Sequence, residues 1–390
     1  MTNHQCPVCE SSRLTAFLNR GQVPVHQNLV VNSQDAARSV VRGELALVVC
    51  EDCGFVFNRA FDFSRLAYGE DYDNTQSCSA FFDAYLDSRV TDLVERQGVR
   101  NSTVVEVGCG KGQFLRKLVE FPGANNKGFG FDPSYVGPDT DLDGLLAFRR
   151  SYYDNTCTDV AADVVVCRHV IEHVPAPLAL LRSVRQALAH TPKARVFFET
   201  PCVEWILCNR VVWDFYYEHC SLFTASSLSL AFERAGFSVD RVDHIFGGQY
   251  LWLEARVTDA TSPTTQGLPE CAPLAHAYAA DENILRQKWL ATLFDLKALG
   301  NVALWGAGAK GATFANLVDP NCDLIDCVVD LNPNKQGRYI PGTGHLIIAP
   351  ADLPRRGVKS AVLMNPNYRE EILRLLAGTG IEIDLVDWSR

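Results

Sequence analysis

The 390-residue sequence lacks several features that mark particular classes of protein. It has no cluster of lysine and arginine, and its formal charge is −10 at pH 7, which argues against nucleic acid or an anionic membrane as its main partner. No apolar run approaches the roughly 18 residues of a membrane-spanning helix, so we expect no transmembrane segment. The N-terminal stretch MTNHQCPVCE has no basic start followed by an apolar run, so we expect no secretory signal either.

The composition is that of an ordinary globular protein, with 47% hydrophobic and 21% charged residues, and this excludes global disorder. The length suits two or three domains rather than one core. With no secretory signal, the fourteen cysteines are expected to be reduced thiols, some of them holding metal, rather than a disulfide framework. We therefore expect a cytoplasmic protein. The sequence does not fix the oligomeric state, and a monomer is compatible with it.

The pattern along the chain predicts four blocks. Residues 1–62 contain two cysteine pairs and the strand-like run GELALVVC. Residues 63–257 begin with a helical pattern and continue with alternating strands and helices, which predicts a mostly parallel sheet covered by helices on both faces. Residues 258–300 contain the turn-rich linker TDATSPTTQG and a helix, and residues 301–390 form a second α/β unit.

The two cysteine pairs have the spacing of a structural zinc site. CPVC and CEDC are CxxC motifs, in which two thiolates from one tight turn bind the same tetrahedral Zn(II). With sulfur in all four positions no coordination site stays open, so such a zinc would be structural. A redox role or incidental pairing is the alternative. The predicted ligands are Cys6, Cys9, Cys50 and Cys53.

A glycine-rich loop follows the first strand of the central block. TVVEVGCGKGQFL reads as a strand that ends in a GxGxG loop and runs directly into a helix. Glycines there let the backbone approach a ligand at the carboxyl end of the sheet. The next strand ends at Asp132, which could bind ribose hydroxyls. The spacing, with an acid two residues ahead of the first glycine, resembles the first motif of class I S-adenosylmethionine-dependent methyltransferases. The loop residues are Glu106, Gly108, Gly110 and Gly112.

A second glycine loop opens the C-terminal block. VALWGAGAKGATFANL contains GxGxxG between a strand and a helix, and Asp330 ends the next strand. Taken alone, this motif indicates a dinucleotide-binding oxidoreductase. Three cations in or after the loop would suit the phosphates of a nucleotide: Lys310, Lys335 and Arg338. A structural α/β layer with ordinary surface cations is the alternative.

Together these modules resemble the sugar C-methyltransferases of deoxysugar biosynthesis, over nearly the whole chain. The resemblance rests on CPVC and CEDC, EVGCGKG, HVIEHV, ETP, YYEHCSLF, GAGAKG and DLNPNKQGRYIPG. It implies an α/β protein with an N-terminal zinc module, a central class I methyltransferase domain and a C-terminal Rossmann-like domain. It also implies S-adenosylmethionine as methyl donor, structural Zn(II) and a nucleotide-linked keto-deoxysugar as acceptor. The segment FFETPCVEWILCNRVVWDF departs from the family in its richness in tryptophan and cysteine, which leaves the acceptor open.

The resemblance also assigns the catalytic residues. In that family a Tyr-x-Glu-His segment supplies the catalytic histidine, and here it matches Tyr216, Glu218 and His219. A neutral imidazole is a plausible base near pH 7 for a proton next to a ketone. Tyrosine hydroxyls from Tyr216 and Tyr72 would stabilise the enolate oxygen.

Glu218 is expected to orient His219, although a flat strand would place the two on opposite faces. A packed edge with one satisfied histidine is the alternative for this segment.

The stretch DVVVCRHVIEHV after the fourth strand region also resembles the methyltransferase family. It adds Arg168 to the expected donor-binding residues and places His173, or the nearby His169, close to the methyl group. For either histidine, helix capping or packing is the alternative role.

The function predicted from the sequence is therefore transfer of a methyl group to a carbon next to a ketone. Two further hypotheses remain. The first is an O- or C-methyltransferase of another small natural-product acceptor. The second is an oxidoreductase or a non-catalytic binding protein that uses the C-terminal glycine loop.

Overall fold

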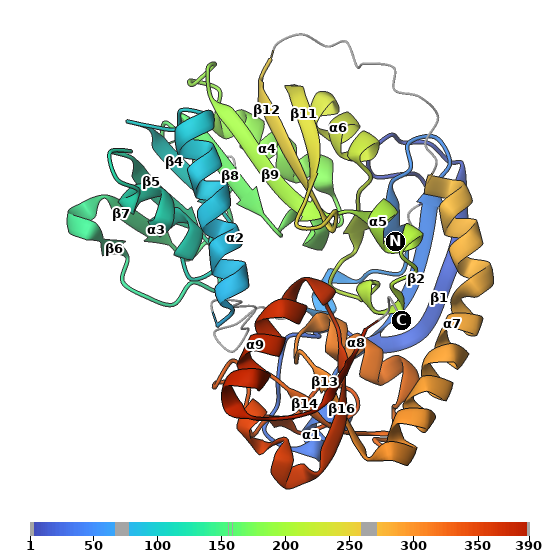
Figure 1. Ribbon diagram of the computed structural model, residues 1–390. Helices are drawn as coiled ribbons and strands as arrows, with labels where there is room; N and C mark the ends of the chain where they lie inside the picture. The colour runs from blue at the N-terminus through green and yellow to red at the C-terminus, as the bar shows by residue number, and fades with distance from the viewer. Residues whose placement is uncertain (1–3, 67–77, 155, 158, 259–270, 388–390) are drawn as a thin grey trace.

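The computed structural model describes residues 4–66, 78–154, 156–157, 159–258 and 271–387. Within these residues the chain forms three separate β-sheets with helices around them, so the expected α/β class is confirmed. Figure 1 shows the largest sheet above the C-terminal one, with one long helix running along the side of the molecule. Over the same residues, no helix combines the length and apolar character needed to cross a membrane.

The N-terminal sheet has the strand order β1-β2-β3-β10, and all its neighbouring strands are antiparallel. The edge strand β10 comes from the end of FYYEHCSLF, more than 160 residues after β3 in the sequence. Its pairing with β3 ties this predicted catalytic segment to the N-terminal sheet. The elements are β1 (Leu14–Pro24), α1 (Gln34–Arg38), β2 (Arg42–Cys50), β3 (Val56–Asn58) and β10 (Ser221–Leu222).

The central sheet has eight strands in the order β11-β12-β9-β8-β4-β5-β7-β6. It is parallel from β9 to β7, and its edges are antiparallel. Its strands are β4 (Thr103–Val107), β5 (Lys127–Phe131), β6 (Thr140–Asp141), β7 (Leu146–Arg149), β8 (Val164–Arg168), β9 (Arg195–Pro201), β11 (Phe237–Ile245) and β12 (Tyr250–Val257).

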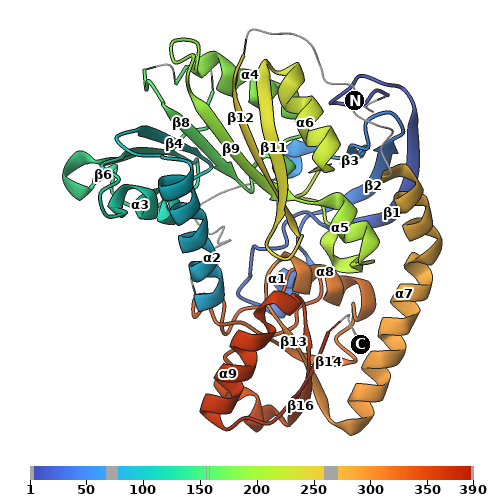
Figure 2. The same ribbon diagram turned by 45° about the horizontal axis from the view of Figure 1, so that its top comes forward.

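Helices cover both faces of this sheet, as the alternation of buried residues along its strands requires. Val104 and Val164 pack in one cluster with residues of α2 and α3, whereas Val105 and Val165 pack in another with residues of α4 and α6. Figure 2 shows these helices on either side of the sheet. They are α2 (Ala80–Thr91), α3 (Gln113–Glu120), α4 (Pro177–Ala187) and α6 (Ala225–Arg234); the short α5 (Val203–Cys208) follows β9.

The C-terminal sheet is wholly parallel, in the order β15-β14-β13-β16-β17. The long helix α7 leads into it and packs against the N-terminal sheet through a shared apolar cluster. The elements are α7 (Cys271–Leu299), β13 (Asn301–Trp305), α8 (Ala309–Val318), β14 (Ile325–Val329), β15 (Ile347–Ile348), β16 (Val358–Leu363), α9 (Arg369–Thr379) and β17 (Asp384–Val386).

Short helical turns join these elements. They are η1 (Phe63–Arg65), the π-type turn η2 (Asp92–Arg96), η3 (Leu142–Gly144), η4 (Ile171–His173), η5 (Val212–Asp214), η6 (Pro350–Asp352), η7 (Pro354–Arg356) and η8 (Pro366–Tyr368).

Strand order reverses once in each parallel sheet, between β4 and β8 in the central sheet and between β13 and β16 in the C-terminal one. In open α/β sheets ligands bind at the carboxyl ends of the strands that flank such a reversal. Both glycine loops lie at these points, because one follows β4 and the other follows β13.

The first prediction concerns the close approach of α8 to the second glycine loop. A Cβ at Gly311 would lie 2.0 Å from the carbonyl oxygen of Gly306, so the backbone would have to move. We expect Gly311→Ala to lower the free energy of unfolding by roughly 1–3 kcal/mol, the usual cost of overpacking, as measured by urea denaturation.

Gly378→Ala is the matched control, because it also lies in a helix, α9, and a Cβ there meets no atom within 4 Å. It should raise stability by up to about 1 kcal/mol, since alanine favours a helix more than glycine does. Equal effects of the two substitutions would contradict the close approach.

Candidate active site

A cavity of about 270 Å³ lies between the carboxyl edges of the central and C-terminal sheets. The central sheet contributes residues that follow β8 and β9, and the C-terminal sheet contributes the loops after β13, β14 and β16. The cavity thus adjoins the second glycine loop and the residues after β8, whereas no residue of the first glycine loop is among those that line it. The titratable residues that line it include His169, Glu172, His173, Asp214, Tyr216, His219, Tyr250, Lys310, Asp330 and Lys335.

The predicted catalytic segment is a turn rather than a strand. Residues 215–220 lie between η5 and β10, with the turn at residues 217 and 218. The turn brings Tyr216 and His219 to the same side, where the Tyr216 hydroxyl lies 3.0 Å from His219 Nε2. Both side chains line the cavity.

Glu218 does not orient His219, which corrects the expectation from the sequence. Its Oε1 lies 3.1 Å from His26 Nδ1, and its Oε2 accepts the backbone N–H of Gln27 at 2.9 Å. The turn sends this carboxylate away from the cavity and into the N-terminal segment, where it is fully buried. Glu218 therefore connects the catalytic turn to the segment at His26 and Gln27, on the side away from the cavity.

Burial and neighbouring charges set the protonation of His219. Burial lowers its pKa well below the usual range, and electrostatic interactions with His173, His169 and Lys310 lower it further. The imidazole is therefore neutral at pH 7. Burial raises the pKa of Tyr216 well above its usual range, so its phenol stays protonated. The ring of His173 packs edge-on against that of His219, with centroids 4.8 Å apart.

Glu172 supplies the carboxylate on the cavity side of this histidine pair. One of its carboxylate oxygens lies within 4.8 Å of a ring nitrogen of His173 and of a ring nitrogen of His219. Its Oε2 accepts a hydrogen bond from Thr200 Oγ1 at 3.1 Å, and its Oε1 lies 3.2 Å from His169 Nδ1. The carboxylate is thus held in place from two directions.

His169 lies between two buried carboxylates at the end of β8. Its Nδ1 faces Glu172, and its Nε2 lies 3.0 Å from Glu199 Oε1. Burial alone would lower the pKa of His169, but Glu199 and Glu172 raise it to about 9. Because both nitrogens face carboxylate acceptors, the ring is an imidazolium at pH 7. Its backbone φ of 54° lies in the left-handed region, which costs energy for a residue other than glycine.

Arg168 is buried and pairs with Glu199, the carboxylate that also contacts His169 Nε2. Its Nε donates to Glu199 Oε2 at 2.7 Å, and its guanidinium lies over the ring of Phe114, 4.5 Å from the centroid. Tyr85 donates to Glu199 Oε1 at 2.8 Å. Although burial would raise it, the pKa of Glu199 is held well below its usual range by Arg168 and His169. Arg168 Nη2 is buried with no partner among the described residues.

The expected donor residues surround the first glycine loop. Asp132 Oδ2 accepts the N–H of Gly110 at 2.8 Å, and its Oδ1 accepts hydrogen bonds from Ser134. Glu106 lies buried below the loop and accepts the N–H of Leu115, in the first turn of α3, at 3.1 Å. Burial raises the pKa of Glu106 to about 8, although Arg168 opposes this.

Space remains at one position of this loop. Gly110 has φ 54°, and a Cβ built there would meet no atom within 4 Å. By contrast, a Cβ at Gly108 or Gly112 would collide with Val170 or Phe148. The loop therefore packs against the protein at two glycines and leaves open space at the third, where a ligand could approach the backbone.

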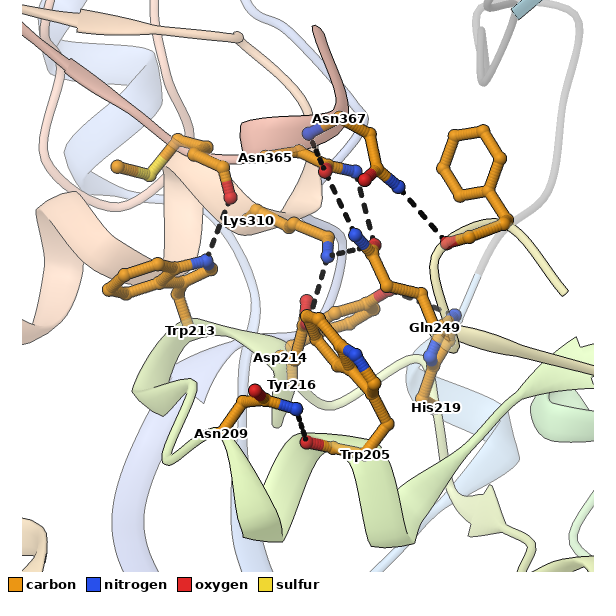
Figure 3. A network of polar contacts seen from close by, with 12 residues as sticks. Trp205, Asn209, Trp213, Asp214, Tyr216, His219, Gln249, Lys310, Asn365 and Asn367 are labelled. Carbon is orange, nitrogen blue, oxygen red and sulfur yellow. Dashed lines mark hydrogen bonds and ion pairs between the residues drawn. The ribbon is translucent and has the colours of Figure 1, made fainter. Parts of the chain in front are cut away.

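Lys310 is held by partners across the cavity rather than left for a ligand. Figure 3 shows its ammonium between Asp214, at 2.8 Å, and Gln249 Oε1, at 3.2 Å. It also lies 5.7 Å from the centroid of the Trp205 ring. Gln249 in turn exchanges two hydrogen bonds with Asn365, after β16, at 2.9 and 3.1 Å. This network joins the second glycine loop to the central sheet.

The other expected substrate cations differ in position. Lys335 lines the cavity, and its Nζ donates to the carbonyl of Ala307 at 3.2 Å. Arg338 is not among the residues that line it. Asp330 accepts the N–H of Ala307 at 2.8 Å, as Asp132 accepts that of Gly110. Each glycine loop is thus braced by the acid at the end of the neighbouring strand.

The four cysteines expected to bind metal do come together. Cys6 Sγ lies 3.6 Å from Cys53 Sγ, and Cys9 Sγ lies 3.4 Å from Cys50 Sγ. All four sulfurs lie within 4.8 Å of one another, so they could hold a metal ion. A tetrahedral site with bonds of about 2.3 Å needs sulfurs roughly 3.8 Å apart, which is close to this spacing.

The remaining expected residue, Tyr72, lies outside the described residues. Sequence reasoning missed Glu172 and Glu199 as parts of the site, although both stand in motifs that carried the family resemblance, HVIEHV and ETP. Their acid character was the available signal. It also missed Tyr250 and Gln249, at the start of β12, which no motif marks.

Comparisons with known proteins place two family matches on the chain. Residues 82–242 match the family described as a methyltransferase domain, and residues 262–380 match the family described as the C-methyltransferase C-terminal domain. The expected enzyme class, an S-adenosylmethionine-dependent methyltransferase, is confirmed by these two domains. The specific assignment to sugar C-methyltransferases goes beyond them.

Curated relatives match part of the chain. It is 35% identical over 117 residues to a ubiquinone biosynthesis O-methyltransferase of Vibrio campbellii, covering 28% of this chain and 47% of the relative. The corresponding protein of Pseudomonas syringae pv. syringae is 32% identical over 120 residues, covering 29% and 50%. The chain thus spans about half the length of the curated relatives it matches.

Among solved structures, Burkholderia thailandensis 1,6-didemethyltoxoflavin-N1-methyltransferase is 14% identical with a TM-score of 0.36, over 47% of this chain and 83% of the other. An S-adenosylmethionine-dependent methyltransferase of Mesorhizobium loti is 18% identical with a TM-score of 0.32, over 44% and 99%.

The second prediction follows from the raised pKa of His169. A folded-state pKa of about 9, above the unfolded value of about 6.5, stabilises the fold fully below pH 6.5, and this contribution is lost as pH rises through 9. We expect His169→Gln to lower stability most at pH 6.5 and below, by about 3 kcal/mol at most, and to flatten the decline towards pH 9.

Urea denaturation between pH 6 and 9.5 measures this difference. His190→Gln, at an exposed position, is the control and should leave the pH dependence unchanged. Parallel curves for the native protein and His169→Gln would show that the two carboxylates do not hold an imidazolium.

Proposed function

We propose that the protein transfers a methyl group from S-adenosylmethionine to a carbon next to the ketone of a nucleotide-linked deoxy-keto-sugar. The observation that carries this proposal is the neutral, buried His219 in contact with the protonated Tyr216, in a cavity that the second glycine loop borders. Carbon methylation needs such a base, because the proton next to a ketone must be removed before the carbon can attack. The match to the C-methyltransferase C-terminal domain supports carbon as the methylated atom.

In this mechanism His219 takes the proton from the carbon beside the carbonyl, and the electron pair of that C–H bond passes to the enolate. The Tyr216 hydroxyl donates a hydrogen bond to the enolate oxygen. Glu172 lies next to the histidine pair and balances the positive charge that His219 gains. S-adenosylmethionine, when bound, would supply an electrophilic methyl group: the enolate carbon would bond to it as the bond between the methyl group and the sulfonium sulfur breaks, which leaves S-adenosylhomocysteine.

The donor would lie at the first glycine loop. The open space beside Gly110 and the unpartnered Arg168 Nη2 both fit a ligand that brings a carboxylate and a sugar to this edge of the sheet. Asp132 already accepts three protein hydrogen bonds, yet an ionised carboxylate offers about four acceptor sites. We therefore keep Asp132 as the ribose ligand, with Glu106, Gly108 and Gly112 shaping the loop.

For the acceptor, we assign the phosphates to the second glycine loop and to Lys335, which both line the cavity. Lys310 contributes less than the sequence suggests, because Asp214 neutralises its charge. Arg338 does not line the cavity, so it would contact only a part of the acceptor that extends outside the cavity. We place His173 near the transferred methyl group, because its ring contacts that of His219. From the sequence alone, the Tyr72 hydroxyl stays a proposed hydrogen-bond donor to the enolate oxygen.

An O- or C-methyltransferase of another small natural product is the second candidate. The observation that favours it is the match to O-methyltransferases of ubiquinone biosynthesis over 117 and 120 residues. Methylation of oxygen needs no enolate, so exchange of the carbon-bound proton distinguishes an O-methyltransferase from the proposed function.

We further propose that the four cysteines hold one structural Zn(II). The four cysteines connect the start of the chain to the turn between β2 and β3. Strand β3 pairs with β10, which directly follows the catalytic turn. A zinc there would stabilise the segment that carries His219.

The third prediction tests this metal. Freshly purified protein prepared without chelator should contain one zinc per chain by elemental analysis. Cys50→Ser should lower both the zinc content and the soluble yield, because one ligand is lost. Cys208→Ser, at an exposed cysteine outside the cluster, should change neither. Native protein with well under one equivalent of zinc would reject the site.

The fourth prediction tests the base. Native enzyme incubated with the keto-sugar and S-adenosylhomocysteine in heavy water should exchange deuterium into the carbon beside the carbonyl, because enolisation does not need the methyl group. His219→Asn should lower both exchange and methylation by about 10²–10⁴-fold, the usual contribution of a general base, while S-adenosylhomocysteine affinity stays near normal.

Tyr216→Phe should slow both steps less, since it removes only a hydrogen bond. No exchange in the native enzyme, together with methylation of oxygen, would replace the proposed function by the second candidate. A loss under tenfold in His219→Asn would remove His219 from the role of base.

A further inference from the structure

One phenol that lines the active-site cavity has no hydrogen-bond partner in the described residues. Tyr250, at the start of β12, is half-buried, and its hydroxyl contacts no donor or acceptor there. Although it lacks a partner, the hydroxyl oxygen is not enclosed by protein, so a ligand in the cavity can reach it. By contrast, the Tyr216 hydroxyl already lies 3.0 Å from His219 Nε2.

Two aromatic rings hold the Tyr250 side chain in place. The ring of Phe246 stacks on it, with centroids 4.8 Å apart and an interplanar angle of 5°. The ring of His169 packs edge-on against it, with centroids 4.5 Å apart and an angle of 73°. The backbone of Tyr250 pairs with Pro201 of β9. The phenol is therefore a fixed group whose hydroxyl requires little reorganisation to meet a ligand.

Tyr250 keeps its proton at pH 7. Burial raises its pKa well above the usual range, and electrostatic interactions with Tyr368, Glu199 and Asp214 raise it further. A protonated phenol can donate one hydrogen bond. The hydrogen of this phenol is not accepted by any atom of the described chain, so it is available to a ligand.

Two observations place Tyr250 beside the catalytic base. His169, whose ring it contacts, also contacts Glu172, and an oxygen of Glu172 lies within 4.8 Å of a ring nitrogen of His219. In addition, electrostatic interaction with Tyr250 contributes to the raised pKa of Tyr216. Tyr216, His219 and Tyr250 therefore line the same part of the cavity.

The single hydrogen of Tyr216 limits what that phenol can do alone. If Tyr216 donates to His219 Nε2, its hydrogen is used within the protein. If the N–H of Nε2 donates to Tyr216 instead, the phenol hydrogen stays available to a ligand. Tyr250 can donate in either tautomer. An enolate oxygen has room for two donors, so Tyr250 replaces Tyr216 in the first case and adds to it in the second.

We propose that Tyr250 is a catalytic residue that donates a hydrogen bond to the ketone oxygen of the acceptor, where the negative charge of the enolate develops. A fixed donor directed at that charge stabilises the transition state more than the bound ketone. Tyr250 keeps its own proton throughout, since His219 removes the proton from carbon. This inference rests on the proposed function and adds to it a residue that no motif of the sequence marks.

Exchange of the carbon-bound proton in heavy water tests this role in the full chain. The probe is a thymidine-diphosphate-linked 4-keto-6-deoxyhexose, with S-adenosylhomocysteine present. Tyr250→Phe should lower the kcat of exchange by about 10–100-fold, the usual effect of losing one hydrogen bond to a charged group, and should change KM little. Tyr152→Phe removes a phenol hydroxyl from a residue that is 62% exposed, and it should leave exchange unchanged.

Urea denaturation separates this role from a structural one. Tyr250→Phe should leave the midpoint of unfolding unchanged, because its hydroxyl has no partner in the part of the chain that the structure describes. Tyr85→Phe should lower the midpoint, because the Tyr85 hydroxyl donates to Glu199 at 2.8 Å. Failure of Tyr250→Phe to fold, or a midpoint lowered as much as in Tyr85→Phe, would show a structural role and overturn the proposal.

The kinetic outcomes distinguish this proposal from the proposed function. A native kcat of exchange in Tyr250→Phe would overturn the proposal. So would a raised KM at native kcat, because the hydroxyl would then hold another part of the acceptor. In both cases the native enzyme still exchanges the proton, so the proposed function stands. A native enzyme that exchanges no proton would instead overturn the proposed function, and this inference with it.

Discussion

The ion pair between Lys310 and Asp214 is the contact on which the shape of the active site depends. It joins the first turn of α8, at the second glycine loop, to η5, immediately before the catalytic turn. Around it, Gln249 and Asn365 exchange hydrogen bonds between the start of β12 and the end of β16. Burial raises the pKa of Asp214, although Lys310 opposes this. Buried pairs of this kind contribute little net stability but are costly to break from one side, so the network determines where the two sheets meet.

Once the two sheet edges are held together, the cavity between them separates the charge states of its histidines. His169 lies between Glu172 and Glu199 and is charged, whereas His219 lies against a tyrosine and another histidine and is neutral. The two rings differ because one has carboxylates at both nitrogens and the other is buried near positive charge. One cavity thereby contains both a fixed cation and a free base, which is the usual way a single fold separates such roles.

The elements and motifs with local signals were predictable from the sequence. The strand–glycine loop–helix units follow from alternating apolar runs and from glycine spacing, and the cysteine pairs follow from CxxC spacing. The orientation of Glu218 was not predictable, because it depends on His26 and Gln27, which lie about 190 residues away and in no motif. The ion pair of Lys310 was not predictable for the same reason, because its partners Asp214 and Gln249 lie far from it in the sequence. The local motif alone therefore suggested a phosphate as its partner. Local patterns identify these residues, but long-range packing decides what each side chain touches.

The protonation of His219 is the central claim, and nitrogen NMR of the histidine rings measures it most directly. Protein labelled with ¹⁵N in its histidines, with the His219 signals assigned by their loss in His219→Asn, should show at pH 7 two well-separated ring nitrogens, as in a neutral imidazole. The same spectrum should show the His169 ring with two similar, protonated nitrogens. Signals of a protonated His219 at pH 7 in the folded protein would contradict the account, because a charged imidazole cannot accept the proton that carbon methylation must remove.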